Sequence, residues 1–178
     1  HVLISSKDYL IAQLTGECVG DVAACSTAGA MNIRNGQWDA ELCEVAEIDM
    51  TILPHLHNPQ DNIGTVTESA AQRTGFSAGT AVYAGIGDAG ATTLASGVSH
   101  PGQYNINIGT SGWIATVSPE PFTDKPGAAN LAFGVEEGFV NAVPFLNAGD
   151  VHKWVTGVFS DGDYAEAHRL IETSKPGS

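Results

Sequence analysis

The segment GIGDAG at residues 85–90 brings three glycines together with one carboxylate, that of Asp88. The apolar run at 81–84 before it predicts a buried strand, and the small residues that follow as far as Ser96 predict a helix. A carboxylate held at such a turn could accept a proton from a substrate hydroxyl, and Gly87 would let that substrate approach the backbone closely. Taken by itself, Asp88 is better explained as the cap of the following helix.

The same segment also matches the G-x-G-x-x-G pattern of dinucleotide-binding turns. Two observations count against that function. The carboxylate of Asp88 would lie beside the pyrophosphate, and the acidic residue expected about 20 positions later is absent. Asn105 and Asn107 stand in that region, and the next acid is Glu120. An oxidoreductase that binds a nicotinamide or flavin cofactor therefore remains only as an alternative.

A second candidate segment is Gly109-Thr110-Ser111-Gly112, which lies between two runs that alternate like strands. Successive backbone N–H groups in such a turn can form a concave binding site for an anion, and the two hydroxyls add donors. An ordinary hairpin turn uses the same residue types. Considered alone, the segment is better explained as that turn.

Composition and charge exclude several functions. The chain has 20 acidic and 7 basic residues, a net charge of -13, so it should repel nucleic acids and anionic membranes. Any phosphate must then be held by local backbone dipoles. Three cysteines without a CxxC pair, Cys18, Cys25 and Cys43, indicate free thiols in a reducing cytoplasm. His55 and His57 lack a third ligand at metal-binding spacing, so we expect exposed loop histidines and no metal site.

Local signals predict alternating helices and strands, and therefore a mixed α/β domain. Ser5 and Asp8 form a capping box, Asn35-Gly36 is a strong hairpin signal, and Asp39 should cap a helix with Leu42, Val45, Ala46 and Ile48 on one face. The expected helices cover residues 5–14, 39–48, 67–75, 88–96, 148–159 and 164–173. The expected strands cover residues 30–33, 63–66, 81–84, 103–108, 113–117, 131–133 and 139–143.

Taken together, the two candidate segments and several others in the same order resemble the FGGY family of carbohydrate kinases, especially its xylulokinase and gluconokinase branch. The resemblance covers nearly the whole chain. It is carried by KDYLIAQLTGE (7–17), Asp21 with CSTAGAMNI (25–33), the W-D-x-E-L stretch (38–42), SAGTAVYAGIGDAGATTLASG (77–97), NIGTSG (107–112) and LNAGDVHKW (146–154).

This resemblance implies two incomplete lobes of the ribonuclease-H-like, actin-like ATPase fold, with mixed sheets and flanking helices. Residues 1–98 correspond to the end of the sugar-binding lobe, and residues 99–178 to the start of the nucleotide-binding lobe. Asp88 would be the catalytic base and would bind the sugar together with Gly87, while Gly109, Thr110, Ser111 and Gly112 would hold the ATP phosphates. The implied substrates are ATP with Mg²⁺ and a pentulose such as xylulose or a sugar acid such as gluconate, in a cytoplasmic protein that could form a homodimer.

The sequence also departs from the family pattern. It lacks the Asp-Gly-Thr type of first phosphate loop, and Ala89 stands where relatives usually carry Asn or Gln. It begins at His1, close to the start of a helix. We therefore expect a section of a longer kinase that is inactive alone; a non-catalytic truncated module is the alternative.

Overall fold

The computed structural model describes residues 1–175, which form helices and short strands in alternation. The helices are α1 (Ser6–Thr15), α2 (Val22–Cys25), α3 (Ala40–Val45), α4 (Glu68–Thr74), α5 (Asp88–Ala95), α6 (Gly149–Ser160) and α7 (Tyr164–Thr173), with 3-10 turns η1 (Ser26–Ala28) and η2 (Met50–Ile52). The strands are β1 (Val19–Asp21), β2 (Met31–Asn32), β3 (Gln37–Trp38), β4 (His55–His57), β5 (Asn62–Thr65), β6 (Ala81–Tyr83), β7 (Tyr104–Ile108), β8 (Gly112–Ser118), β9 (Ala129–Ala132) and β10 (Phe139–Phe145).

The strands form one larger sheet and three small pairs. The larger sheet is antiparallel in the order β7-β8-β10-β9, so β7 lies at an edge. Strands β2 and β3 form the expected hairpin, β5 pairs antiparallel with β6, and β1 pairs parallel with β4. The parallel pair joins segments that are distant in the sequence, which no local signal predicted.

The main hydrophobic core lies between one face of the larger sheet and α5. Its buried members come mostly from β8, β9 and β10: Val98, Ala115, Val117, Leu131, Phe133, Val140 and Ala142. Ile86, Ala89 and Leu94 pack against them from α5 and the loop before it. A second cluster joins Val22 of α2 to Ala132 of β9. The segment around Asp88 is therefore anchored on the sheet that follows it in the chain.

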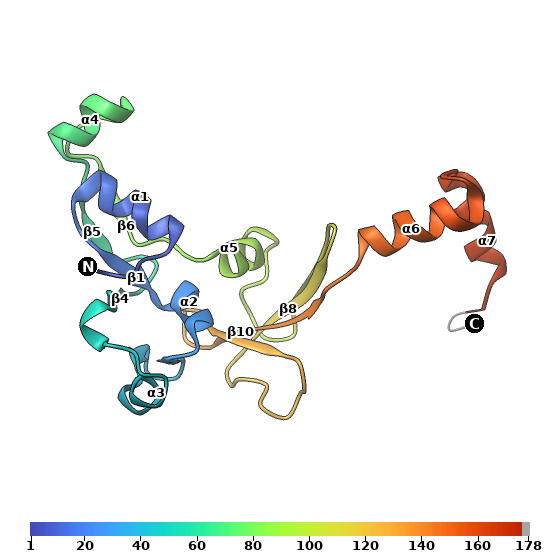
Figure 1. Cartoon of the computed structure of the whole chain (residues 1–178), viewed down its shortest axis with the longest axis horizontal. Coiled ribbons are helices and arrows are strands. Elements are labelled where there is room, and N and C mark those ends of the chain that lie inside the picture. Colours follow the sequence, from blue (N-terminus) through green and yellow to red (C-terminus); the bar gives the residue numbers. More distant parts are fainter. Residues whose placement is uncertain (176–178) are drawn as a thin grey trace.

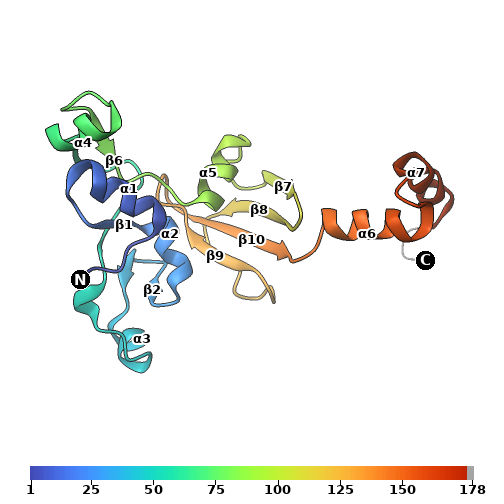
Figure 2. The same cartoon turned by 45° about the horizontal axis from the view of Figure 1, so that its top comes forward.

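Figures 1 and 2 show how these parts are arranged in space. The small strand pairs and α1–α4 gather at the N-terminal end, the larger sheet and α5 lie in the middle, and α6 with α7 extends away from the sheet. Within residues 1–175, none of the helices combines the length and hydrophobicity needed to cross a membrane.

Most local predictions are confirmed. Ser5 caps α1 by accepting a hydrogen bond from the amide of Asp8, and Gly16 ends that helix with φ 88°. Asp39 and Thr67 cap α3 and α4 as expected. The two C-terminal helices also lie where the sequence placed them, and Asp163 caps the second. Each of these signals acts within one turn of a helix, so distant contacts do not alter it.

Four predictions about burial or structure type are wrong. The apolar face expected on α3 is largely exposed, since Leu42 and Val45 are 46% and 80% exposed while Cys43 is buried. Strand β6 is not buried: only Ala84, just beyond its end, is fully covered. His55 and His57 lie in strand β4 instead of a loop. Tryptophans are expected to pack in the interior because of their large apolar rings, but Trp154 is 64% exposed on α6.

Candidate active site

Asp88 is the first residue of α5, and its side chain is exposed. The N-cap position belongs to Gly87, which has no side chain to act as a cap. The prediction that Asp88 caps this helix is therefore wrong, because Asp88 lies inside its first turn. One carboxylate oxygen of Asp88 accepts a hydrogen bond from the adjacent amide of Ala89 at 2.8 Å. No other residue of the described chain bonds to this carboxylate, so its second oxygen is available to a ligand. The helix N-terminus also favours a negative charge at this place.

Two cavities meet at Asp88. One, of about 520 Å³, is lined by Ser5, Ser6, Lys7, Ala24, Ile86, Gly87 and Asp88. The other, of about 170 Å³, lies between α2 and the start of α5 and shares Ser5, Ala24, Gly87 and Asp88 with the first. Gly87 allows a close approach there: a Cβ on it would lie 3.1 Å from both Cα and Cβ of Ala24, a tight contact that would require Ala24 to shift. Gly87 and Asp88 thus lie together at the wall of a hollow.

The predicted phosphate segment forms the turn between β7 and β8. The amide of Gly109 donates to the carbonyl of Ser111 at 2.8 Å and closes the turn. Within residues 1–175, the amides of Thr110 and Ser111 find no acceptor, so both can donate to an anion. The carbonyls of Gly109 and Thr110 accept from Gly149 and Ala148 at 2.8 and 3.0 Å, which fixes the turn against the start of α6.

Asp88 and the β7–β8 turn are held by the same core but do not share a cavity. Neither hollow at Asp88 includes a residue of Gly109–Gly112. Figures 1 and 2 show the turn at the end of the sheet where α6 begins, away from the start of α5. The described residues therefore place the two candidate segments in separate surroundings.

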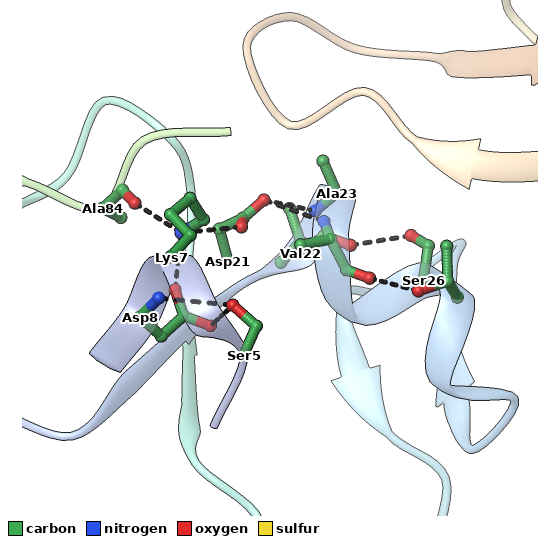
Figure 3. A network of polar contacts seen from close by, with 10 residues as sticks. Ser5, Lys7, Asp8, Asp21, Val22, Ala23, Ser26 and Ala84 are labelled. Carbon is green, nitrogen blue, oxygen red and sulfur yellow. Dashed lines mark hydrogen bonds and ion pairs between the residues drawn. The ribbon is translucent and has the colours of Figure 1, made fainter. Parts of the chain in front are cut away.

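A charged cluster around Lys7, which lines the larger hollow at Asp88, was not predicted from the sequence (Figure 3). The ammonium of Lys7 lies 2.5 Å from Asp8 Oδ1 and 3.0 Å from Asp21 Oδ2, and it donates to the carbonyl of Ala84 at 2.7 Å. Asp8 and Asp21 are both fully buried. Asp21 Oδ1 also caps α2 by accepting from the amides of Ala23 and Ala24, which confirms the capping role expected of it.

This cluster changes two pKa values. Burial of Lys7 alone would lower its pKa, but its hydrogen bond with Asp8 and the charge of Asp21 outweigh burial and raise it. Burial, reinforced by the charges of Asp8 and Asp21, raises the pKa of the Cys25 thiol to about 11. Cys25 is thus a protonated, unreactive thiol near neutral pH. Sequence reasoning missed the cluster because charged residues are exposed by default, and only the fold shows which ones are covered.

The fold is that of solved xylulose kinases. Xylulose kinase from Lactobacillus acidophilus superimposes with a TM-score of 0.87 at 24% sequence identity, over 98% of this chain and 36% of that one. This likeness confirms the expected fold class.

The family model described as FGGY family of carbohydrate kinases, N-terminal domain, matches residues 1–95. The chain belongs to the FGGY family of carbohydrate kinases. Gluconokinase from Bacillus subtilis (strain 168) is 28% identical to it over 167 residues, covering 94% of this chain and 33% of that protein. Autoinducer-2 kinase from Yersinia enterocolitica is 31% identical over 167 residues, covering 92% of this chain and 31% of that protein. The chain spans about a third of the length of these curated relatives.

Proposed function

We propose that this chain is the central section of an ATP-dependent kinase that phosphorylates a sugar hydroxyl. Residues 1–98 would complete the sugar-binding lobe, and residues 99–178 would begin the nucleotide-binding lobe. The family model supports this division because it describes an N-terminal domain and ends at residue 95. Membership of the family also favours a kinase over the dinucleotide-binding alternative for the segment at 85–90.

The observation that carries the proposal is the placement of Asp88. Its carboxylate is exposed at the start of α5, keeps one oxygen free within the described residues, and borders two cavities. A carboxylate in this position can accept the proton of the sugar hydroxyl as that oxygen attacks phosphorus. Apart from this proton transfer, phosphoryl transfer needs the protein mainly to position the reactants and to stabilise charge. One well-positioned base therefore supplies the acid–base catalysis that the reaction needs.

The β7–β8 turn would hold the phosphates of ATP. The free amides of Thr110 and Ser111 supply donors without adding a positive charge, which suits a chain with a net charge of -13. Asp88 and this turn would face one another across the cleft between the completed lobes. Lobe closure would bring the two walls together and exclude water that competes with the sugar.

Mg²⁺ would enter as part of the substrate MgATP. Within residues 1–175, no group of three His, Cys, Asp or Glu side chains could hold a metal ion. Mg²⁺ in phosphate-transferring sites usually keeps several waters and is bound mainly through the phosphates. The described residues therefore do not form a dedicated metal site.

The proposed sugar is a pentulose such as xylulose or a sugar acid such as gluconate, as in the relatives named above. The free thiols of Cys18, Cys25 and Cys43 support a reducing, cytoplasmic location. A coupled assay of the complete polypeptide with xylulose and with gluconate tests the activity. We expect sugar-dependent ADP release from the complete polypeptide and none from residues 1–178 alone. Robust turnover by residues 1–178, or none by the complete protein with either sugar class, would contradict this proposal.

A further inference from the structure

Lys7 connects three segments of the chain beside the hollow at the candidate base (Figure 3). Its ammonium donates hydrogen bonds to Asp8 on its own helix and to the carbonyl of Ala84, and it forms an ion pair with Asp21 just before α2. Asp21 Oδ2 makes no hydrogen bond in the described chain, so the ion pair with Lys7 is the contact that compensates its charge. Two of the three N–H groups of Lys7 are thus engaged by protein, and its side chain lies at the wall of the larger hollow.

Ala84 and Gly85 are both hydrogen-bonded at the start of the loop that carries Asp88. The amide of Ala84 donates to Asp61 and the amide of Gly85 donates to Pro59, at 3.0 and 2.9 Å. The Lys7 bond holds the opposite side of the same peptide, the carbonyl of Ala84. Gly85 then turns with φ 67°, Ile86 packs against the main core, and Gly87 lies against Ala24. The Lys7 bond is therefore one of the contacts that set the direction in which the loop leaves Ala84.

The ammonium of Lys7 also helps to hold α2, whose residue Ala24 lines the same cavity. Asp21, its ion-pair partner, fixes the first turn of α2 through the amides of Ala23 and Ala24. Ala24 in turn packs against Gly87, with no room for a Cβ between them. Lys7 thus joins the two sides of the cavity on which Asp88 stands.

We propose that Lys7 is a positioning residue for phosphoryl transfer, which holds the 84–88 loop so that the Asp88 carboxylate points at the sugar hydroxyl. This inference rests on the proposed function, since it gives Lys7 a role only if Asp88 acts as the base. It is distinct from a role in stability, because a residue that acts through Asp88 has no effect on turnover once Asp88 is disabled.

A double-mutant cycle in the complete kinase tests the coupling. The variants are Lys7→Met, Asp88→Asn and the pair, with kcat measured per ATP-binding site so that unfolded molecules are not counted. We expect Lys7→Met to lower kcat about 10- to 100-fold, the range for a misplaced reacting group, with little change in the KM for ATP. In the Asp88→Asn background, the same substitution should lower kcat no further.

Lys7→Met leaves two buried carboxylates without their cation, so the variant could fail to fold. Lys7→Met combined with Asp21→Asn preserves the net charge of the cluster but still loses the bond to Ala84. This variant should also lower kcat when Asp88 is present and lower it no further in the Asp88→Asn background. Arg73→Ala is the matched control, because Arg73 links α4 to Gln13 at the far end of α1. It should leave kcat unchanged.

The results of this cycle distinguish the positioning role of Lys7 from the proposed role of Asp88 as the base. Unchanged kcat in Lys7→Met, or an equal loss in both backgrounds, overturns the positioning role while the proposed function stands. Normal turnover in Asp88→Asn overturns the base assignment itself, and the role of Lys7 then falls with it.

Discussion

The amide of Gly149, the first residue of α6, donates a hydrogen bond to the carbonyl of Gly109 at 2.8 Å. This contact places the start of a helix directly against the turn that we assign to the ATP phosphates. A Cβ on Gly149 would lie only 2.6 Å from the Gly109 carbonyl oxygen, a backbone atom that cannot move without moving the turn. The glycine is therefore required by close approach.

Gly149→Ala should accordingly displace the β7–β8 turn and weaken ATP binding by about tenfold or more, the cost of roughly one to two lost hydrogen bonds. Equilibrium titration of ATP into the complete kinase measures this. Gly157→Ala is the control on the same helix, because a Cβ there meets nothing within 4 Å. It should stabilise α6 by up to about 1 kcal/mol and leave ATP affinity unaltered, and equal effects of the two substitutions would argue against our account.

Asp88→Asn should reduce kcat by about 10² or more, since the amide cannot accept the proton, while ATP still binds. The coupled assay and an ATP titration give the two readings. Asp163→Asn is the matched control: Asp163 caps α7, where an asparagine oxygen can replace the carboxylate. Near-normal turnover in Asp88→Asn would remove this residue from the role of base.

Removing the cation of the buried cluster should cost more stability than removing an exposed one. Lys7→Met leaves Asp8 and Asp21 buried and unpaired, and we expect a loss of about 3 kcal/mol in the free energy of unfolding. Lys125 pairs with Asp124 in full solvent exposure, so Lys125→Met should have no resolvable effect. Urea unfolding of both variants compares their stability. Similar unfolding midpoints for the two would show that the Lys7 cluster contributes nothing to the free energy of unfolding.

Cys25 should resist thiol reagents that modify Cys18. With a pKa of about 11 for Cys25, about one thousandth of this thiol is ionised at pH 8, whereas Cys18 is exposed. Between the ordinary value of 9.0 and about 11, the unfolded chain releases a proton that the folded chain retains, so stability should fall as pH rises through this window. Labelling of a Cys18→Ser variant against pH measures the reactivity. Rapid labelling of Cys25 at pH 8 would contradict the raised pKa.

Residues 1–178 alone should associate with themselves through the edge of the larger sheet. Ile106 and Ile108 on the edge strand β7 are 54% and 71% exposed, and Ile106 pairs with the exposed Ile114 across the strands. Exposed apolar edges of this kind promote pairing between chains. Light scattering should show mass rising with concentration, and Ile108→Lys should reduce that rise. Val45→Lys, on the exposed face of α3, should leave that rise unchanged. If both variants reduced the rise equally, or neither did, the chains would associate through a surface other than the β7 edge.

Much of the secondary structure and the position of the candidate base could be predicted from the sequence. The caps at Ser5, Asp39 and Thr67, the Asn35-Gly36 hairpin and the helix that starts at Asp88 all depend on hydrogen bonds within about one turn of the chain. Such interactions need no distant partner. The Gly-rich loops and their order along the chain were likewise enough to indicate the family.

Burial and long-range pairing were decided only by the tertiary structure. Whether Cys43 or Val45 faces the interior depends on which surface meets α3, and the parallel pairing of β1 with β4 joins segments whose sequences carry no mutual signal. The Lys7–Asp21 ion pair was likewise decided only by the tertiary structure. The sequence specifies each charge, but only the packing of α1, α2 and the 84–88 loop removes water from around them and so makes the pair a structural link.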